Sequence, residues 1–527
     1  MSNSPPRSAL TIGSPRATFP AMEAPGAAPT TLLDLFSAIP DDRIAVVVPE
    51  QNIRVSYGAL RRQVESVASA LAAAGIGRGD RVGMALPNGL PTIVAFLAAS
   101  TAGTAAPLNP GYKEDEFRFF LDDTGARVLL LPPQGAAEAR RAAGDRVRVL
   151  GVELDGAGTV RLPEVAAGRT LAAPAVDDVA LILHTSGSTG RPKRVPLSHA
   201  NLSISARNVA RSYALTAEDV SLCVMPLFHV HGLVASTLAT LATGGTVVVP
   251  EKFNPLSFWR VARDHAVTWY SAVPTLHQLL LARAPAGSAR PPGAEKLRFI
   301  RSCSAPLAPQ VMHDLEAAFG APVLEAYGMT EAAHQMASNP PPPGRRLPGS
   351  VGPGTDVSIS IMDERGRHLP AGERGEVVIQ GPNVTAGYEN NPEANASCFT
   401  DGWFRTGDQG FLDSDGYLTL VGRLKELINR GGEKISPREI DEVLLAHPAV
   451  AEAVCFGVPH PTWGEEVAAV VVLSGAATEA DLQAYCRERL ADYKRPKRIH
   501  ITETIPRTAT GKIQRRVVAQ AFSPGDS

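Results

Sequence analysis

The chain has 527 residues, 44% of them hydrophobic and 20% charged, with a formal net charge of −2. This length allows a large core and more than one domain. The near-neutral charge excludes a global field that would draw the chain to nucleic acid or an anionic membrane, and no run of about 18 apolar residues predicts a spanning helix. The five cysteines form no CxxC pair, so neither a zinc site nor a dithiol redox motif is expected, and reduced thiols favour a cytoplasmic protein.

Residues 1–30 are rich in Ser, Pro and Ala and lack the compact apolar segment of a secretory signal, so they predict a disordered lead-in. From residue 31 onward, short apolar runs alternate with Ala-rich helical patterns. This alternation is typical of an α/β domain with mostly parallel strands, which we expect to extend over 31–423. The predicted strands are IAVVVP (44–49), RVGMAL (81–86), TAAPLN (104–109), VRVLGV (147–152), VALILHT (179–185), GGTVVVP (244–250) and VTWYSAV (267–273).

The pattern changes after Gly349. The segments VSISIMDERGRHL (357–369) and GEVVIQG (375–381) alternate with a two-residue period and have Asp/Gly turns between them. Such alternation predicts half-buried strands, and therefore a smaller β-rich subdomain within the large domain.

The last part of the chain, 424–527, predicts a small α+β domain of typical size. Its first helix is expected to begin at a capping box. In this box Ser436 is the N-cap, Pro437 occupies the first helical position and Glu439 lies three residues after the cap.

The segment HTSGSTGRPK (184–193) follows a predicted strand and precedes a helix that Ser198 is expected to cap. Gly187 and Gly190 allow backbone N–H groups to turn inward around an anion, and Lys193 adds positive charge. The spacing GxxxxGK[ST] of a Walker A loop is absent. Taken alone, the segment is slightly better explained as an exposed Ser/Gly turn.

Five further motifs accompany this loop: PLFHVHG (226–232), YGMTE (327–331), GWFRTGD (402–408), GRLKELINRGGEKISPREID (422–441) and PRTATGKIQRR (506–516). In this order they resemble the motifs of adenylate-forming enzymes, a superfamily of acyl-CoA synthetases, luciferases and peptide-synthetase adenylation domains, and the resemblance covers residues 30–520. It implies that a carboxylate attacks the α-phosphate of ATP, that pyrophosphate leaves, and that coenzyme A then displaces AMP. It also implies a mobile C-terminal domain.

The resemblance assigns residues to the first step, in which two anions must meet. Lys512 would bridge the carboxylate and the α-phosphate, and Thr330 would bind the α-phosphate. Glu331 would hold Mg²⁺, with Thr185 as a second ligand. The phosphate loop would use Thr185, Ser186, Gly187, Ser188, Thr189, Gly190 and Lys193.

Other matched positions would bind the nucleoside. Asp408 would accept hydrogen bonds from both ribose hydroxyls, Tyr327 would stack on adenine, and Arg423 would contact ribose or phosphate. The positions that would line the base also include Ser304, Ala305, Pro306, Glu325 and Ala326.

The second step needs a different arrangement in the same place. The resemblance implies rotation of the C-terminal domain about a hinge at Lys425. Rotation would withdraw Lys512 and bring Gly431 and Gly432 to the tunnel for the pantetheine arm of coenzyme A. His229 would gate the acyl site by closing against ATP.

Polar residues collect where the resemblance places the acid pocket: His231, Ser302, Ser304 and His334, with Gly328 nearby. A lone histidine is more often a satisfied interior residue, but two at a pocket for an acid are harder to explain that way. A protonated imidazole can pair with a second carboxylate, and its burial requires such a partner. These polar residues therefore predict a small dicarboxylate as the acid substrate.

A closer resemblance, to plant and fungal oxalate–CoA ligases, agrees with this prediction. Gly328 departs from it, because the plant form has alanine there; we expect this difference to alter the pocket shape only slightly. The segments that carry the resemblance include LRFIRSCSAPLAP (297–309), PVLEAYGMTEAAHQMASNP (322–340), GPNVTAGYENNPEAN (381–395) and FGVPHPTWGEE (456–466).

We therefore predict an acid–CoA ligase that uses ATP, Mg²⁺ and coenzyme A and acts on oxalate. A ligase for malonate, another short acid or an aromatic acid is the alternative of the same class. A catalytically inactive binding protein with the same fold is the alternative of another class. No nucleic-acid or membrane partner is expected, and the sequence leaves the choice between monomer and homodimer open.

Overall fold

The computed structural model describes residue 28 and residues 30–166, 168, 171–185, 192–285, 290–507 and 513–523. Most of the predicted lead-in, the loop residues Ser186, Gly187, Ser188, Thr189 and Gly190, and Lys512 lie outside the described residues. Among the residues described, none of the helices combines the length and the apolar character that crossing a bilayer would require.

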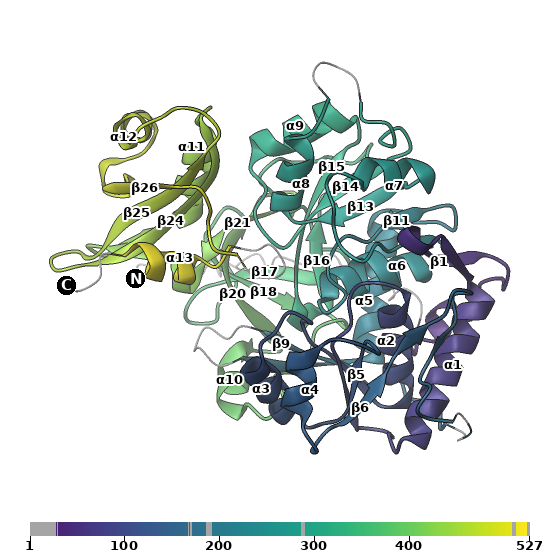
Figure 1. The fold of residues 1–527 in the computed structure, drawn as a ribbon. Helices are drawn as coiled ribbons and strands as arrows, with labels where there is room; N and C mark the ends of the chain where they lie inside the picture. Colours follow the sequence, from purple (N-terminus) through teal and green to yellow (C-terminus); the bar gives the residue numbers. More distant parts are fainter. Residues whose placement is uncertain are drawn as a thin grey trace, which may run out of the picture.

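Two large sheets form the centre of the molecule (Figure 1). The eight-stranded sheet has the order β16-β15-β14-β13-β11-β12-β1-β2. Its inner pairs are parallel, whereas β15·β16 and β1·β2 at its edges are antiparallel. Its strands are β1 (Ile44–Val48), β2 (Ile53–Ser56), β11 (Val220–Leu222), β12 (Thr246–Val248), β13 (Trp269–Ala272), β14 (Phe299–Ser302), β15 (Val323–Met329) and β16 (His334–Ser338).

The six-stranded sheet has the order β10-β9-β4-β3-β5-β6, and only β9·β10 is antiparallel. The predicted α/β class with mostly parallel strands is therefore confirmed. Strands β5 and β10 of this sheet, and β2, β11, β14, β15 and β16 of the eight-stranded sheet, were not among the predicted strands. The strands are β3 (Arg81–Met84), β4 (Thr104–Pro107), β5 (Ala126–Leu131), β6 (Arg148–Gly151), β9 (Val179–Thr185) and β10 (Lys193–Ser198); β7 (Glu153–Leu154) and β8 (Val160–Arg161) form a separate ribbon.

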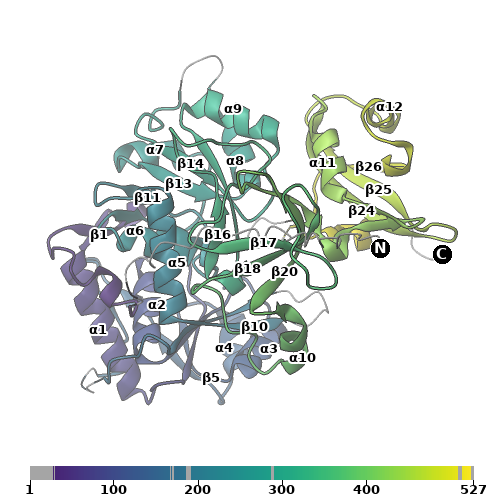
Figure 2. The same cartoon turned by 180° about the vertical axis from the view of Figure 1, so that it is seen from behind.

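Helices cover both sheets (Figures 1 and 2). Ser198 caps α5 as predicted, because its hydroxyl accepts a hydrogen bond from the Asn201 amide. Helix α5 packs against β9 and β10 of one sheet and β16 of the other, so it joins the two halves of the core. The helices are α1 (Tyr57–Ala73), α2 (Leu90–Ala102), α3 (Glu114–Thr124), α4 (Ala137–Ala143), α5 (His199–Ser212), α6 (Ala239–Leu241), α7 (Phe258–Asp264), α8 (Pro274–Leu281) and α9 (Pro309–Phe319), with a π-helix at His231–Leu238.

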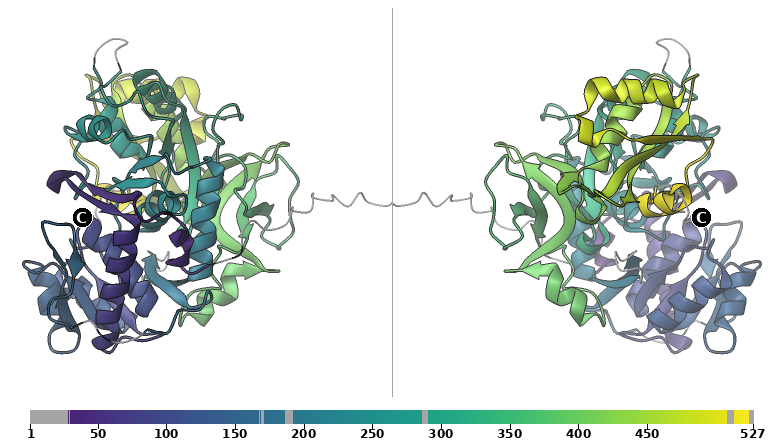
Figure 3. Two further views of the ribbon diagram at one scale, coloured as in Figure 1. Left: turned by 90° about the vertical axis from the view of Figure 1, so that its right-hand side faces the viewer. Right: turned by 90° about the vertical axis from the view of Figure 1, so that its left-hand side faces the viewer.

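The predicted β-rich subdomain is an antiparallel sheet on the flank of the molecule, drawn in light green in Figure 3. Its residues alternate between buried and half-buried positions along β20, as expected for a sheet with one face on the core. The elements are β17 (Ser358–Met362), β18 (Gly375–Gln380), α10 (Pro392–Cys398), β19 (Phe399–Thr400), β20 (Trp403–Leu412) and β21 (Leu418–Arg423).

The C-terminal part has its own sheet and its own apolar core, which includes Ile428, Ile435 and Leu482. A short turn of 3₁₀-helix, Leu424–Glu426, joins it to β21. Its elements are β22 (Ile428–Arg430), β23 (Glu433–Ile435), α11 (Pro437–Leu445), β24 (Val450–His460), β25 (Gly464–Leu473), α12 (Glu479–Arg489), β26 (Arg498–Thr502) and α13 (Arg515–Phe522).

The predicted capping box of α11 is wrong. The Ser436 hydroxyl makes no hydrogen bond to the helix and instead donates to the Val421 carbonyl on β21, at 2.6 Å. Glu439 forms an ion pair with Lys494 rather than reaching back to the cap. Both side chains that the local pattern assigns to the capping box therefore form tertiary contacts instead.

Candidate active site

The carboxyl ends of the parallel strands β13, β14 and β15 lie side by side, which is the edge where open α/β sheets bind ligands. Ser302 pairs in register with Ala272 on one side and with Glu325 on the other. The antiparallel β15·β16 pair adds His334 opposite Met329. The fold thus gathers most of the residues predicted to line the base and the acid pocket.

The predicted phosphate loop connects β9 and β10, which pair antiparallel. Thr185 at the end of β9 pairs in register with Lys193 at the start of β10, so these two residues close the loop. Strand β10 separates the loop from α5, and the N-terminus of that helix does not directly follow the glycines as it does in a Walker loop.

An ion network that the sequence analysis missed holds this hairpin. Arg194 on β10 pairs with Asp123 and Glu389, each at 3.4 Å, and Arg81 also pairs with Glu389. His184 Nε2 lies 3.0 Å from the Asp123 carboxylate. Burial lowers the pKa of His184, and the contact with Asp123 opposes this effect. The network ties the base of the loop to α3 and to the segment before α10.

Glu331 is 5% exposed and lies in a short 3₁₀-turn directly after β15. Its Oε1 accepts a 2.8 Å hydrogen bond from the Tyr388 phenol, and the Lys193 ammonium lies 4.5 Å from the centre of the same ring. Burial raises the pKa of Glu331, whereas hydrogen bonds and the charges of Arg423 and Lys193 oppose the shift. Tyr388 was not among the predicted site residues, because a lone tyrosine in TAGYEN gives no indication of this contact.

This carboxylate suits Mg²⁺. The described residues contain no group of three or more His, Cys, Asp and Glu side chains that could hold an ion by themselves. A single carboxylate beside a phosphate loop fits Mg²⁺, because this ion keeps water and phosphate oxygens as its other ligands. The half-buried Thr185 hydroxyl lies at the base of the same loop.

Asp408 lies on β20, directly opposite Arg423 on β21. Arg423 Nε is 2.8 Å from Asp408 Oδ1, and the Tyr327 phenol donates to Oδ2. Burial raises the pKa of Asp408, and the Arg423 charge opposes the shift. These three predicted nucleoside residues therefore form one cluster, in which Tyr327 contacts Asp408 through its hydroxyl.

Glu325 is fully buried below this cluster. Its Oε1 accepts from the Leu307 amide at 3.3 Å, and its Oε2 has no hydrogen-bond partner among the described residues. Burial raises the pKa of Glu325 to about 7. Ala305 and Pro306 directly precede Leu307 on the segment after β14, and Ser304 on the same segment has φ 73°, a left-handed conformation that is rare for serine.

His231 begins the π-helix and is buried. Its Nδ1 lies 3.0 Å from Ser304 Oγ and its Nε2 lies 2.6 Å from Ser271 Oγ. The His334 ring stands edge-on to it, with centroids 5.1 Å apart. The buried Ser302 hydroxyl has no hydrogen-bond partner within the described part of the chain. His231 thus contacts both Ser304 and His334, two of the other residues predicted for the acid pocket.

Gly328 permits this arrangement. A Cβ at residue 328 would lie 2.1 Å from the His334 carbonyl oxygen and 2.5 Å from its Nδ1. The expectation that alanine would alter the pocket only slightly is therefore wrong for this backbone, because His334 would have to move.

The remaining predicted residues make none of the contacts described above. His229 lines a small pocket with Phe228, His184 and Tyr112. Lys425 is exposed in the turn between β21 and β22. Gly431 and Gly432 have φ of 61° and 93° in the β22–β23 turn, and a Cβ at Gly431 would lie 3.0 Å from the Trp463 ring, which the sequence analysis did not consider.

Known proteins resemble this chain over nearly its whole length. The AMP-binding enzyme family model matches residues 37–389, and the AMP-binding enzyme C-terminal domain matches 439–512. An oxalate–CoA ligase from Arabidopsis thaliana is 48% identical over 92% of this chain and 96% of its own length. An oxalate–CoA ligase from Saccharomyces cerevisiae is 43% identical over 93% and 96%, and a sulfoacetate–CoA ligase from Cupriavidus necator is 40% identical over 90% and 94%.

Solved structures share the whole fold. ATP-bound MatB from Rhodopseudomonas palustris aligns with a TM-score of 0.85 and 32% identity, covering 94% of this chain and 99% of its own. O-succinylbenzoate coenzyme A synthetase from Bacillus subtilis, in complex with ATP and magnesium ion, aligns with a TM-score of 0.81 and 30% identity over 93% and 99%. With its two matched domains and its full-length relatives, the chain belongs to the AMP-binding enzyme family.

Proposed function

We propose that this chain is an ATP-dependent acid–CoA ligase that converts oxalate to oxalyl-CoA through an acyl-adenylate. We choose oxalate as the acid because His231, Ser304 and His334 form a buried polar cluster near the ends of β14 and β16. Full-length relatives named oxalate–CoA ligase support the same substrate.

In the first step, charge neutralisation lets the carboxylate approach ATP. The loop between Thr185 and Lys193 would hold the phosphates, and Thr330 would bind the α-phosphate. Glu331, with Thr185, would hold Mg²⁺, which when bound neutralises phosphate charge. Lys512, outside the described residues, would bridge the two reactants.

The nucleoside would occupy the carboxyl ends of β14 and β15. One oxygen of Asp408 is paired with Arg423. The other oxygen, which now accepts from the Tyr327 hydroxyl, would accept from the ribose hydroxyls instead when ATP binds. Glu325 has an unpaired buried oxygen, which would accept from the adenine amino group if the carboxylate is ionised. The ring of Tyr327 would then stack on the base.

For the second step we place a domain boundary at residues 423/424. Strand β21, which ends at Arg423, belongs to the third sheet, whereas β22 belongs to the C-terminal sheet. The chain passes between them through the short turn around the proposed hinge, Lys425. Rotation there would bring Gly431 and Gly432 to the coenzyme A tunnel, where the absence of side chains leaves room for the pantetheine arm, while His229 gates the acyl site.

The cysteine pattern favours a cytoplasmic enzyme, and the near-neutral net charge argues against nucleic-acid or membrane partners. The enzyme would be either a monomer or a homodimer. A small acid with a sulfonate in place of the second carboxylate is the second candidate substrate. Sulfoacetate has the same charge as oxalate, although it is larger by a methylene group, and a relative is named sulfoacetate–CoA ligase.

Pyrophosphate release measured side by side with oxalate, sulfoacetate, malonate, acetate, a medium-chain fatty acid and 4-coumarate tests the proposal. We expect kcat/KM to be highest for oxalate. A rate on oxalate no better than on the fatty acid would overturn the choice of acid. Absence of pyrophosphate release with every acid would favour a binding protein instead.

A further inference from the structure

A buried arginine stands behind the acid pocket. Arg301 on β14 is 0% exposed. Its Nε–H donates to Tyr213 Oη at 2.8 Å, one Nη–H to Ser271 Oγ at 2.9 Å and the other to Gln335 Oε1 at 2.9 Å. All three acceptors are neutral, and no acidic side chain of the described residues pairs with this guanidinium. A buried charge without a counter-charge is costly, so the site favours an anion nearby.

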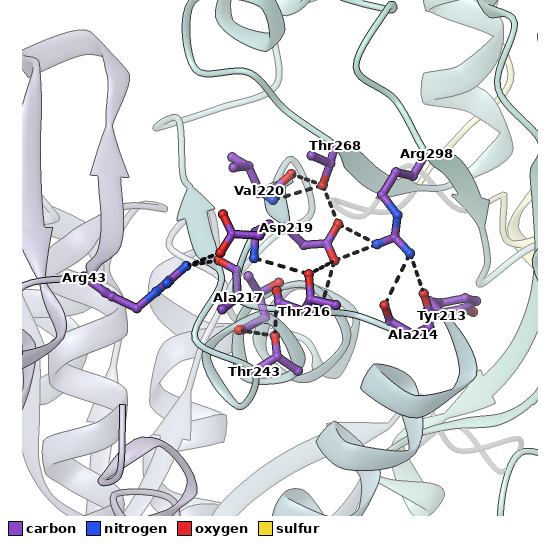
Figure 4. Close-up of polar contacts among 12 residues, drawn as sticks. Arg43, Tyr213, Ala214, Thr216, Ala217, Asp219, Val220, Thr243, Thr268 and Arg298 are labelled. Atoms are coloured by element: carbon purple, nitrogen blue, oxygen red, sulfur yellow. Dashed lines mark hydrogen bonds and ion pairs between the residues drawn. The ribbon is translucent and has the colours of Figure 1, made fainter. Parts of the chain in front are cut away.

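The side of Arg301 that faces away from the pocket is held firmly. Tyr213 is the C-cap residue directly after α5, and its ring stacks on Phe299 with centroids 4.9 Å apart. The carbonyl groups of Tyr213 and Ala214 accept hydrogen bonds from Arg298, which forms an ion pair with the buried Asp219 (Figure 4). The guanidinium therefore has little freedom to turn away from the pocket.

On the pocket side, a chain of hydrogen bonds leads from Arg301 to the surface of the pocket. Arg301 can only donate, so Ser271 Oγ accepts from it. The Ser271 hydrogen is then available for His231 Nε2, 2.6 Å away. If Nε2 accepts, neutral His231 carries its hydrogen on Nδ1 and donates it to Ser304 Oγ at 3.0 Å. The Ser304 hydroxyl can then donate into the pocket.

We propose that Arg301 is a specificity-determining positioning residue, which supplies the positive charge for the second carboxylate of the acid and fixes the donor direction of the Ser271–His231–Ser304 chain. This inference rests on the proposed function and deepens it. It replaces the expectation of a protonated imidazole: Arg301 Nη1 lies 3.5 Å from His231 Nε2, and a guanidinium at that distance opposes a second positive charge. The permanent charge belongs to Arg301, and His231 remains neutral.

Binding of oxalate and of oxamate, its near-isostere with a neutral carboxamide, separates charge from shape. Affinities are measured by titration calorimetry in the presence of a non-hydrolysable ATP analogue. We expect Arg301→Met to weaken oxalate binding by about tenfold or more and oxamate binding much less, because the charge matters only for oxalate. Arg301→Lys should restore part of the oxalate preference. Equal weakening of both acids, or no change, would overturn the inference.

Two variants cover the case in which Arg301→Met does not fold. Ser271→Ala keeps the arginine and breaks the chain, so it should reduce the oxalate preference. Tyr213→Phe removes a different Arg301 partner, on the side away from His231, so it should reduce the preference less than Ser271→Ala does while lowering the melting temperature. An unchanged preference in Ser271→Ala, or the same loss in both variants, would contradict the positioning role.

Nitrogen-15 NMR of the histidine rings tests the donor direction without any substrate. The His231 signals, assigned with His231→Gln, should show hydrogen on Nδ1 and none on Nε2 in the wild type, and a mixed state in Ser271→Ala. The opposite tautomer, or an imidazolium, would refute the chain. Oxalyl-CoA formation by the wild type is measured separately: its absence would refute the proposed function, whereas the NMR result decides this inference.

Discussion

Tyr388 donates a 2.8 Å hydrogen bond to Glu331, from a position 57 residues further along the chain. Its ring also lies 4.5 Å below the Lys193 ammonium, so one side chain contacts both the predicted metal carboxylate and the predicted phosphate lysine. Because β10 carries Lys193 and the turn after β15 carries Glu331, Tyr388 links the two large sheets at the point where ATP phosphates would bind.

Tyr388→Phe should slow adenylation by about 10- to 100-fold, since a hydrogen bond to a charged group is worth about 1.5–3 kcal/mol. The variant should also shift the pH dependence. Burial raises the pKa of Glu331 and the Tyr388 hydrogen bond lowers it, so its loss raises the pKa further. Glu331 must be ionised to hold Mg²⁺, and activity should therefore fall at a higher pH than in the wild type as the solution is acidified. Pyrophosphate release measured from pH 5 to 9 checks both effects.

Tyr485→Phe is the matched control, because Tyr485 lies in the C-terminal part and its phenol donates to the Ala446 carbonyl. It should leave the pH profile unchanged. A Tyr388→Phe profile that superimposes on that of the wild type would mean that the phenol does not act on Glu331.

Lys512→Ala should separate the two half-reactions. Loss of a charge that acts on the adenylation transition state typically lowers the rate by about 10²–10³-fold. Thioester formation from supplied acyl-adenylate should continue, because domain rotation would withdraw this lysine before the second step. Rapid-quench measurement of each half-reaction checks the prediction, and equal loss of both would contradict the assigned role.

The sequence predicted those features that depend on local pattern. Apolar runs such as 179–185 became strands, and Ser198 became a cap, because their neighbours in the chain supply the periodicity and the partner. Ser436 failed as a cap because its partner, Val421, lies on another element and only the tertiary structure brings them together. For the same reason, the sequence did not indicate roles for Tyr388 and Arg301. Their importance comes from contacts with residues 57 and 88 positions away, which no local pattern reports.

Gly328→Ala should damage the acid pocket. The new Cβ would lie 2.1 Å from the His334 carbonyl oxygen, so the backbone or His334 must shift. Overpacking of this kind typically costs about 1–3 kcal/mol. We expect a lower melting temperature and a larger rise in KM for oxalate than for ATP. Gly156→Ala, where no atom lies within 4 Å of the added Cβ, is the control and should change neither quantity. Equal rises in both KM values would indicate general distortion rather than a pocket effect.

Glu325→Gln should change how stability depends on pH. The pKa of Glu325 rises from its ordinary value of 4.5 to about 7 on folding. A raised pKa means that the folded state holds the proton more tightly, so the stabilisation is complete below pH 4.5 and is lost as the pH rises through 7. The loss amounts to about 3 kcal/mol at most. Glutamine is isosteric and cannot ionise, so the variant should lose less stability than the wild type between pH 5 and 8.

Thermal unfolding of both proteins at several pH values between 5 and 8 measures this difference. Glu433→Gln, at an exposed position on β23, should follow the wild type. Parallel curves for Glu325→Gln and the wild type would show that Glu325 does not titrate differently in the folded protein.

Arg298→Met should destabilise the fold without removing a residue assigned to chemistry. Arg298 Nη1 lies 2.6 Å from the carboxylate of Asp219, which is almost completely buried, and Nη2 donates to carbonyl groups at the end of α5 (Figure 4). Its loss leaves a buried carboxylate with the Thr268 hydroxyl and the Thr216 amide as hydrogen-bond donors, so we expect the free energy of unfolding to fall by about 1.5–3 kcal/mol.

Arg263→Met is the control, because it breaks the exposed pair with Asp264 and should cost about 0–1 kcal/mol. Urea unfolding compares the two. Equal costs would mean that the buried carboxylate is stabilised without Arg298, and that the end of α5 beneath Tyr213 does not depend on this ion pair.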